Sequence, residues 1–284
     1  MATSTRAIPH PEIGTELVRD WAPEGDPDAF IVLVHGLAEH SGRYERTAVL
    51  LAEAGFHVRG FDLIGAGGSG GQRWHIDDWD RYHDQIRTHV TWAQEHGKPV
   101  VLMGHSLGGA ICLGYLLSDR PAPDLAVLSS PALAGGDGWQ KKVVPVLGKL
   151  LPGLSLPNPV KGEHLSRDPA VAEAYFADPL VTPKATLGFG AEALAEIERL
   201  NRELDRLDTP CLVIHGGDDK LVPTWCSEPL GELSCVDRKV YEGLRHETMN
   251  EPEGPEVIAD IVSWIKSNLE RPPGSVGPAE EDLA

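Results

Sequence analysis

The stretch that most constrains the fold of this chain is Pro99–Ala110, which reads PVVLMGHSLGGA. Its apolar start predicts a short buried strand, and the residues after Ser106 predict the first turn of a helix. Between them, Gly104–Gly108 matches the Gly-x-Ser-x-Gly pattern of a strained turn that exposes a serine nucleophile. Glycine suits Gly104 and Gly108 because a side chain there would collide with the strand and helix that the turn joins. We therefore predict that Ser106 is a nucleophile and not an incidental serine in a glycine-rich turn.

Around this turn, apolar runs alternate with segments of helical spacing. The expected strands are Ile13–Trp21, Phe30–Val34, Phe56–Phe61 and Ala126–Leu128, with helices at Tyr44–Ala54 and Trp79–Glu95. Such alternation forms βαβ units, so we predict an α/β fold with a mostly parallel sheet flanked by helices. Side chains after the carboxyl ends of parallel strands meet at one edge of the sheet. His35, Asp62 and Ser106 each follow a predicted strand and are expected there.

Strand signals disappear between residues 131 and 207. Val143–Val160 is apolar and interrupted by prolines, and helices are expected at Ala170–Ala177 and Leu187–Leu207. We predict that 131–207 is an inserted helical cap, with 1–130 and 208–270 as the core; the alternative is that 131–207 is simply more core. Strands resume at Cys211–Ile214 and Lys239–Tyr241, and an amphipathic helix closes the core at Pro255–Leu269. Residues 271–284 are rich in proline, glycine and acids and are predicted to be disordered.

The charge balance limits the partners of the chain. With 43 acidic against 25 basic residues, the formal net charge is −18. This argues against a nucleic-acid partner, which requires a basic surface, and it disfavours purely electrostatic docking on anionic membranes. The segment Met1–Glu24 has no apolar core of signal-peptide length, and no run is long enough to span a membrane, so we expect a cytoplasmic protein.

No metal or organic cofactor is predicted. The four cysteines include no Cys-x-x-Cys pair, so a zinc site is not expected; Cys226 and Cys235 could bridge in principle, but a chain of this size does not need a disulfide. The glycine-rich loop Gly65–Gly71 does not fit a Gly-x-Gly-x-x-Gly turn that is followed by a helix, so no dinucleotide site is expected.

A serine nucleophile needs a base, and the base needs an orienting acid. Of the histidines that follow Ser106, His246 lies after the last predicted strand and just before the closing helix, where the base is expected. The acid is expected in the loop after His215, which contains Asp218 and Asp219. His35 and His105 are interpreted as structural residues. Glu39 and Arg43 are interpreted as an ion pair, with the polar end of a binding pocket as the alternative.

Several stretches together resemble the monoacylglycerol lipase and lysophospholipase-like branch of the α/β-hydrolases. The matching stretches are His35–Tyr44, Asp62 with Gly65–Gly70, Gly104–Gly109, Asp178–Val181, His215–Gly216 and His246–Glu251. The resemblance implies an α/β-hydrolase fold without a cofactor, and its His-Gly-x-x-Asp-x-x-Val pattern places the acid on Asp219. It also implies that the backbone N–H groups of Leu37 and Leu107 form an oxyanion hole. One departure is Ala66, where the family commonly has His, and it puts the local packing in doubt.

The resulting hypothesis is a serine esterase in which Ser106, His246 and Asp219 form a catalytic triad. The expected substrate is a monoacylglycerol or a similar single-chain ester, because the apolar part of the cap could enclose an acyl chain. As in the resembled lipases, the cap could also lie transiently against micelles or a membrane. A general carboxylesterase or lysophospholipase, a peptidase or amidase, and a non-catalytic ligand-binding protein remain alternatives. A dehalogenase or epoxide hydrolase is disfavoured because it needs Asp in place of Ser106. The oligomeric state is left open.

Overall fold

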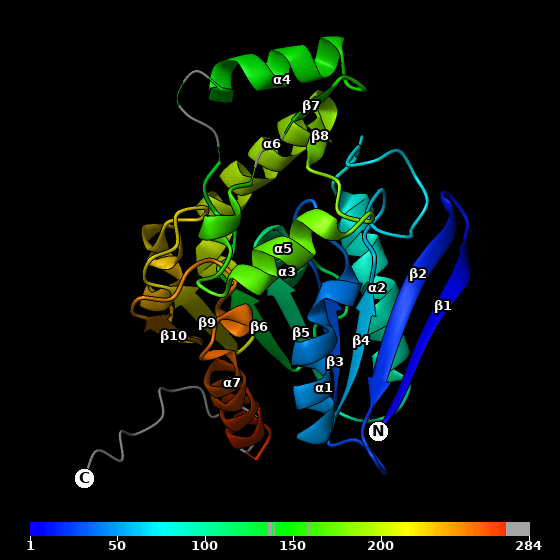
Figure 1. Cartoon of the computed structure of the whole chain (residues 1–284), viewed down its shortest axis with the longest axis vertical. Helices are drawn as coiled ribbons and strands as arrows, with labels where there is room; N and C mark the ends of the chain where they lie inside the picture. Colours follow the sequence, from blue (N-terminus) through cyan, green and yellow to red (C-terminus); the bar gives the residue numbers. More distant parts are fainter. Residues whose placement is uncertain (136–137, 139, 158–159, 271–284) are drawn as a thin grey trace.

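The computed structural model of the chain describes residues 1–135, 138, 140–157 and 160–270. A central sheet has the strand order β1-β2-β4-β3-β5-β6-β9-β10 (Figure 1). Its strands are β1 (Ala2–His10), β2 (Gly14–Ala22), β3 (Ala29–Val34), β4 (Phe56–Phe61), β5 (Val100–His105), β6 (Leu125–Ser129), β9 (Cys211–Gly216) and β10 (Val236–Tyr241). The hairpin β1–β2 joins the sheet antiparallel, and all pairs from β4 to β10 are parallel.

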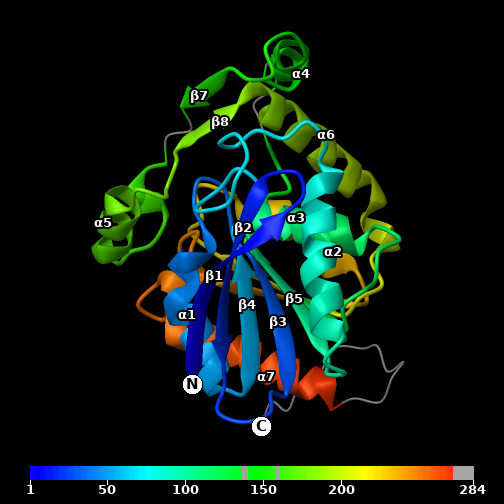
Figure 2. The same cartoon turned by 90° about the vertical axis from the view of Figure 1, so that its right-hand side faces the viewer.

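Helices cover both faces of this sheet. α1 (Glu45–Glu53) and α7 (Gly254–Leu269) contribute to one apolar core, while α2 (Asp80–Gln94) and α3 (Leu107–Leu116) contribute to the other (Figure 2). Because side chains alternate along a strand, successive residues of β3 and β5 are divided between the two cores. The predicted α/β fold with a mostly parallel, helix-flanked sheet is therefore confirmed.

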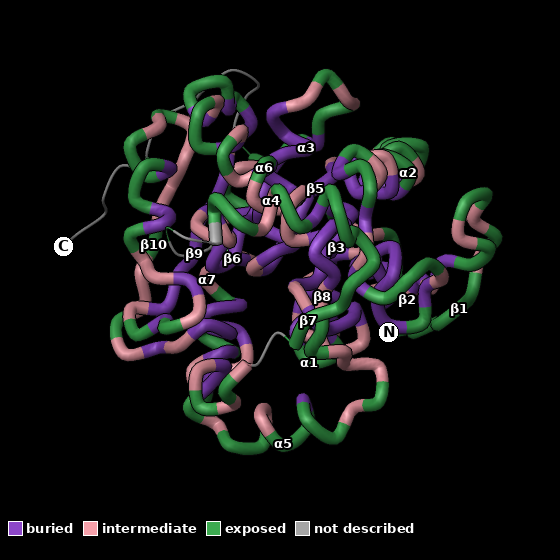
Figure 3. The backbone as a smooth tube through the Cα atoms, turned by 90° about the horizontal axis from the view of Figure 1, so that it is seen from above, coloured by how far each residue is buried: buried purple, intermediate pink, exposed green. Residues whose placement is uncertain are grey.

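Between β6 and β9 the chain leaves the sheet and forms the segment 131–207, which we call the cap. Its elements are α4 (Gln140–Leu150), β7 (Ser155–Pro157), η2 (Gly162–His164), α5 (Pro169–Ala177), β8 (Lys184–Thr186), α6 (Leu187–Glu203) and η3 (Leu204–Arg206). α4 lies above α6 at the top of the molecule, and α5 lies on the other side of the cap (Figures 1 and 2). From above, the central strands are mostly buried, whereas α5 and β1 are largely exposed (Figure 3).

Two of the secondary-structure predictions are wrong. β1 was not expected; it is exposed along most of its length, so it shows no apolar alternation that could reveal it. Strands do occur in the cap, because β7 pairs with β8 in an antiparallel ladder. Each is only 3 residues long, which is too short for a periodic signal. The expected helix at Leu187–Leu207 ends earlier, at Glu203, and continues as a 3₁₀ turn.

The other predicted elements lie where expected, with small shifts at their ends. A short 3₁₀ turn, η1 (Ser41–Tyr44), precedes α1, and further 3₁₀ turns η4 (Thr224–Ser227), η5 (Pro229–Glu232) and η6 (Thr248–Asn250) lie in the loops around β10. All four cysteines are free thiols, so Cys226 and Cys235 form no bridge. The predicted disorder of 271–284 lies outside the described residues.

Candidate active site

Ser106 occupies a sharp turn between β5 and α3. Its backbone is left-handed, with φ of 54° and ψ of −118°, a conformation that costs a non-glycine residue of order 1–3 kcal/mol. Hydrogen bonds hold the turn: the Ser106 N–H donates to the Ser129 carbonyl at 2.8 Å, and the Ser106 carbonyl accepts from Ala110 N–H at 3.1 Å. The side chain is half-buried and lines a cavity. Strain of this kind is typical of a turn that presents a nucleophile.

The two glycines of the turn are required, for partly different reasons than expected. A Cβ on Gly104 would lie 2.5 Å from the Gly108 carbonyl oxygen and 2.6 Å from Cys112 Sγ, so it would collide with α3 as predicted. A Cβ on Gly108 would instead meet the backbone after a different strand, lying 2.3 Å from the Val34 oxygen and 2.5 Å from the His35 oxygen. Gly108 therefore allows α3 to pack directly against the end of β3.

His246 and Asp219 lie together although 27 residues separate them, and His246 Nδ1 donates to Asp219 Oδ2 at 2.7 Å. His246 is in the loop after β10 (residues 242–253, the β10 loop), and Asp219 is in the loop after β9 (residues 217–223, the β9 loop). Asp219 Oδ1 accepts the backbone N–H groups of Leu221 and Val222 at 2.8 and 2.9 Å. Burial raises the pKa of Asp219, but hydrogen bonds from His215, His246 and Val222 outweigh it and leave that pKa well below its ordinary value.

The two neighbouring aspartates of the β9 loop have different environments in the structure. Asp218 is exposed, whereas Asp219 is buried and hydrogen-bonded to His246. His246 and Ser106 line the same cavity. Ser130 Oγ holds the loop by donating to the His246 carbonyl at 3.1 Å. The fold thus gathers the nucleophile, base and acid predicted from sequence at the carboxyl edge of the sheet.

The residues predicted to form an oxyanion hole border the same cavity. Leu37 lies in the loop after β3 (residues 35–40, the β3 loop), and Leu107 is the first residue of α3, whose N-terminus carries a partial positive charge. The β3 loop packs against the nucleophile, since a Cβ on Gly36 would lie 3.3 Å from Ser106 Cβ. Glu39 Oε1 closes this loop by accepting the Gly36 N–H at 2.6 Å.

The cavity has a volume of about 520 Å³ and walls of two kinds. Its apolar wall comes mostly from the cap and includes Val144, Leu156, Leu187, Ala193, Leu194 and Ile197. Its polar wall contains Glu39, Arg43, Glu247 and Tyr175. The cavity can therefore hold a molecule with an apolar chain and a polar end.

A buried ion network forms the polar wall. Arg43 binds both Glu247 carboxylate oxygens at 2.9 Å and also contacts Glu39, which accepts the Tyr44 hydroxyl at 2.8 Å. Burial raises the pKa of Glu39, but the Arg43 guanidinium outweighs it and keeps the pKa below its ordinary value. The Arg43 guanidinium lies 4.9 Å from the ring centroid of Tyr175 on α5. Glu39 and Arg43 are thus both an ion pair and part of the pocket, so the two readings of the sequence are compatible.

The histidines interpreted as structural are buried and held by hydrogen bonds. His35 Nε2 accepts the Leu63 N–H at 3.0 Å, and His105 Nδ1 lies 3.0 Å from Ser129 Oγ. Burial, with the neighbouring His246, lowers the pKa of His105 to about 4, so its ring is neutral near pH 7. Ala66, the departure from the family pattern, is buried in the core beside α2.

Some site residues had no predicted role. Tyr175 carries no motif that sequence reasoning could use. Glu247 and Asp178 stood inside stretches that matched the family, but spacing alone assigned them nothing. Among the described residues, no three His, Cys, Asp or Glu side chains lie where they could hold a metal ion together. Nor does any helix in the described ranges combine the length and apolar character needed to cross a membrane.

The parallel sheet, the strained serine turn and the histidine–aspartate pair define the class of this protein, a serine hydrolase of the α/β-hydrolase fold. The family model for serine aminopeptidases, S33, matches residues 25–253. The chain belongs to this family.

Similar proteins indicate to which branch of that family the chain belongs. The monoacylglycerol lipase of Mycolicibacterium smegmatis is 38% identical over 90% of this chain and 95% of its own length. Human monoglyceride lipase is 32% identical over 92% of this chain and 88% of its own length. Among solved structures, Paleococcus ferrophilus monoacylglycerol lipase superposes with a TM-score of 0.80 at 33% identity, covering 88% of this chain and 98% of that one. The chain is accordingly a serine ester hydrolase of the monoacylglycerol lipase-like branch.

Proposed function

We propose that the protein hydrolyses monoacylglycerols, or similar esters with one acyl chain, to a fatty acid and an alcohol. The observation that carries this proposal is the cavity, which is lined by Ser106, by an apolar wall and by a polar wall. A single acyl chain suits the residues of α4, β7 and α6. The polar alcohol suits the wall formed by Arg43, Glu247 and Tyr175. The relatives that are named for this activity support the same substrate class.

In the proposed mechanism, Ser106 Oγ attacks the ester carbonyl carbon while His246 takes the hydroxyl proton. Asp219 holds the imidazole in the required tautomer through Nδ1 and stabilises its charged form. The N–H groups of Leu37 and Leu107 receive the oxyanion, a contribution of roughly 3 kcal/mol for each donor. His246 then gives the proton to the leaving alcohol. A water molecule, deprotonated by the same histidine, cleaves the acyl-enzyme and releases the fatty acid.

The polar wall contains a group suited to the alcohol part of the substrate. The Tyr175 hydroxyl is buried and has no hydrogen-bond partner among the described residues, and Tyr175 is one of the residues that line the cavity. Leaving a buried hydroxyl unpaired costs about 1–3 kcal/mol. A substrate hydroxyl placed beside Tyr175 and Glu247 would remove this cost, which favours a polyol ester over a simple alkyl ester.

The experiment compares kcat/KM for monoacylglycerols of 8 to 18 acyl carbons (roughly the size range of such a cavity), triacylglycerols, p-nitrophenyl acetate and aminoacyl-arylamides. We expect monoacylglycerols to be the best substrates and Ser106→Ala to abolish turnover while the protein stays folded. Preference for triacylglycerols, for acetate over longer chains, or for arylamides would overturn the substrate assignment. Turnover that survives Ser106→Ala would overturn the mechanism.

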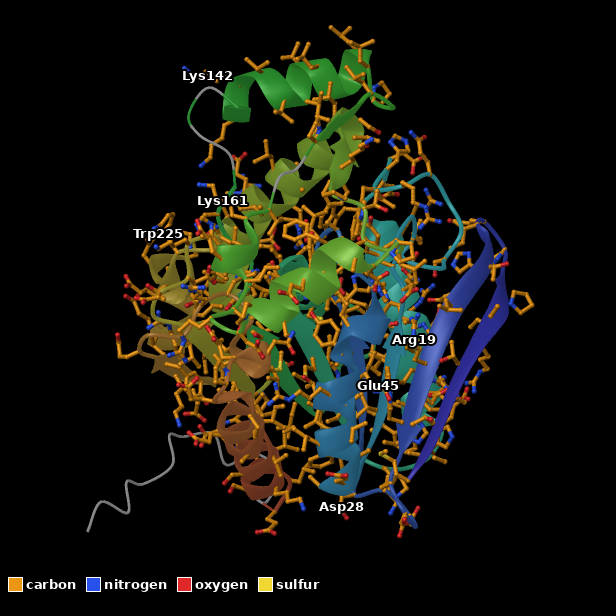
Figure 4. All side chains as sticks on the ribbon, in the orientation of Figure 1. Arg19, Asp28, Glu45, Lys142, Lys161 and Trp225 are labelled. Carbon is orange, nitrogen blue, oxygen red and sulfur yellow. The ribbon has the colours of Figure 1, made fainter. Side chains whose placement is uncertain are left out.

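The outer face of α4 supports a further part of the proposal, a transient contact between the cap and a lipid surface. Val146 and Leu150 on this helix are 57% and 70% exposed, and Lys142 and Lys149 on the same helix are exposed as well. Figure 4 shows Lys142 at the top of the molecule. Residues 140–162 contain four lysines and no acidic residue, in a chain of net charge −18. This local reversal of charge suits an anionic lipid surface. A cytoplasmic location remains a prediction.

A further inference from the structure

The β3 loop, which carries Leu37, is held by the cap and not only by the core. Thr182 N–H donates to the Ala38 carbonyl at 3.0 Å. His40 Nε2 lies 2.8 Å from Asp178 Oδ2. Both partners follow α5 in the cap. They are far from the β3 loop in the sequence; Asp178 and His40, for example, are 138 residues apart. The loop beside the nucleophile is therefore bonded at two points to the segment 178–182 that follows α5.

The His40 ring is fixed at both of its nitrogens. Its Nδ1 accepts the backbone N–H of Gly42 at 3.1 Å, so in the neutral ring the proton is on Nε2. That N–H donates to Asp178. The ring is only 5% exposed, and Asp178 is fixed in turn because its Oδ1 accepts the Leu180 N–H at 2.8 Å. His40 thus links the backbone of the β3 loop to the C-terminal end of α5.

The part of the loop that receives these bonds is strained. Ala38, next to Leu37, has a φ of 66°, in the left-handed region that alanine rarely adopts. Such a conformation persists only where the surroundings fix it. The Thr182 and Asp178 contacts, together with the Glu39 bond to Gly36 N–H, supply that fixation on both sides of Leu37.

The other end of α5 is bound to the loop that carries His246. Glu247 N–H donates to the Leu165 carbonyl at 2.8 Å, and Ser166 Oγ donates to Glu251 at 3.1 Å. The segment 164–182, which we call the strap, therefore connects the two loops that flank Ser106. By contrast, the backbone-to-backbone hydrogen bonds of the described α4–β7 residues run within the cap, such as Leu187 N–H to the Leu154 carbonyl at 2.9 Å. One side-chain bond, from Gln72 Nε2 to the Gly153 carbonyl at 3.4 Å, joins this segment to the core.

We infer that Asp178 is a positioning residue for the oxyanion hole: through His40 it sets the direction of the Leu37 N–H. The inference rests on the proposed role of Leu37. Once the strap is in place, Asp178 contributes to the rate of the chemical step and not to substrate binding. Because small displacements of a positioned group lower rates strongly, loss of this contact is expected to lower kcat about tenfold, less than the loss of an oxyanion donor itself.

The experiment compares Asp178→Ala with a matched control, Asp168→Ala. Both aspartates accept the backbone N–H of the second following residue at an end of α5, and only Asp178 also contacts His40. We measure kcat and KM for p-nitrophenyl butyrate, affinity for an alkylboronic acid that mimics the tetrahedral intermediate, and Tm. Asp178→Ala should lower kcat and boronate affinity about tenfold with KM within twofold, and Asp168→Ala should change Tm but not kcat.

A double-mutant cycle tests whether Asp178 acts through His40. Adding Asp178→Ala to His40→Ala should lower kcat by less than about twofold more. The inference is overturned if both aspartate variants lose kcat alike, if only KM or Tm changes, or if the two losses multiply. If Asp178→Ala does not fold, Asp178→Glu replaces it in the experiment. This variant keeps the carboxylate but displaces it, and it should likewise lower kcat about tenfold. Failure of Ser106→Ala to abolish turnover would instead refute the proposed function, so the two failures are distinguishable.

Discussion

At the scale of single residues, the sequence was most informative where backbone geometry restricts the choice of amino acid. Gly104 and Gly108 face backbone or side-chain atoms less than 3 Å from any added Cβ, so their pattern carried the prediction of the serine turn. Asp219 was placed by the family spacing, whereas the residues alone left Asp218 open. Tyr175 and Asp178 could not be assigned a role from the sequence, because their partners Arg43 and His40 are more than 100 residues away and no periodic pattern records such contacts.

The two acids of the β9 loop can be distinguished by isosteric substitution. Asp219→Asn should lower kcat by about 10³- to 10⁴-fold, because an amide cannot hold the His246 tautomer or stabilise its charge. Asp218→Asn, at the exposed neighbour, should stay close to the wild type. Steady-state kinetics on p-nitrophenyl butyrate measure both, and circular dichroism checks the fold. The reverse ranking would show that the wrong acid has been chosen.

The close approach of α3 to β3 predicts a large effect of one methyl group. Gly108→Ala should lower the free energy of unfolding by about 1–3 kcal/mol, since the added Cβ meets two backbone carbonyls that cannot move independently. The control is Gly153→Ala, where the nearest atom would be a side-chain nitrogen 3.6 Å away. Urea unfolding measures the difference. Equal stability of the two variants would mean that the contact between α3 and the end of β3 is not as tight as described.

At the scale of secondary-structure elements, length and burial decided what could be predicted. Strands buried on both faces, such as β3 and β5, show continuous apolar runs and were predicted within a few residues. β1 and β7 are exposed, and β7 and β8 are each only 3 residues long, so none of the three strands has such a signal. The edge of the sheet depends instead on charges: Asp20 on β2 binds Arg59 Nε on β4 at 2.7 Å and Arg6 on β1 at 3.0 Å.

This ion cluster predicts how stability depends on pH. Burial raises the pKa of Asp20, but bonds from His57 and Arg59 outweigh it and lower that pKa from 3.8 to about 2. A lowered pKa stabilises the folded state above the unfolded value, and this stabilisation is lost as pH falls toward 2. Asp20→Asn should therefore cost about 2 kcal/mol at pH 7, and its difference from the wild type should shrink between pH 5 and 2. Urea midpoints across this range measure the effect; a difference independent of pH would contradict it.

At the scale of the whole molecule, the sequence predicted the architecture. Its net charge, however, does not show how the charges are distributed over the surface. The net charge of −18 disfavours purely electrostatic docking on anionic membranes. The fold modifies this average locally, because the exposed residues Lys142 and Lys149 lie on α4 together with the exposed apolar residues Val146 and Leu150. Which charges share a surface depends on tertiary structure, and composition does not contain that information.

The α4 face can be tested by vesicle co-sedimentation. The wild type should bind vesicles of mixed phosphatidylcholine and phosphatidylglycerol more strongly than phosphatidylcholine alone. Lys142→Gln with Lys149→Gln should remove that preference, and Val146→Ser with Leu150→Ser should weaken binding to both. Trp225→Ser is the control, because Trp225 is 59% exposed but lies away from α4 (Figure 4). Loss of binding in Trp225→Ser, or no effect of the α4 changes, would place the contact elsewhere.

The cap consists of the strap and an outer part formed by α4 and β7, and this division suggests how the substrate preference of such enzymes can change in evolution. The strap is hydrogen-bonded to both loops beside Ser106, whereas α4 and β7 contribute to the apolar wall, α4 packing on α6 and β7 pairing with β8. Mutations that reshape the acyl-binding wall can therefore accumulate in α4 and β7 during evolution without disturbing the reacting groups. Homologues should diverge in chain-length preference mainly through the outer part, while the strap changes slowly.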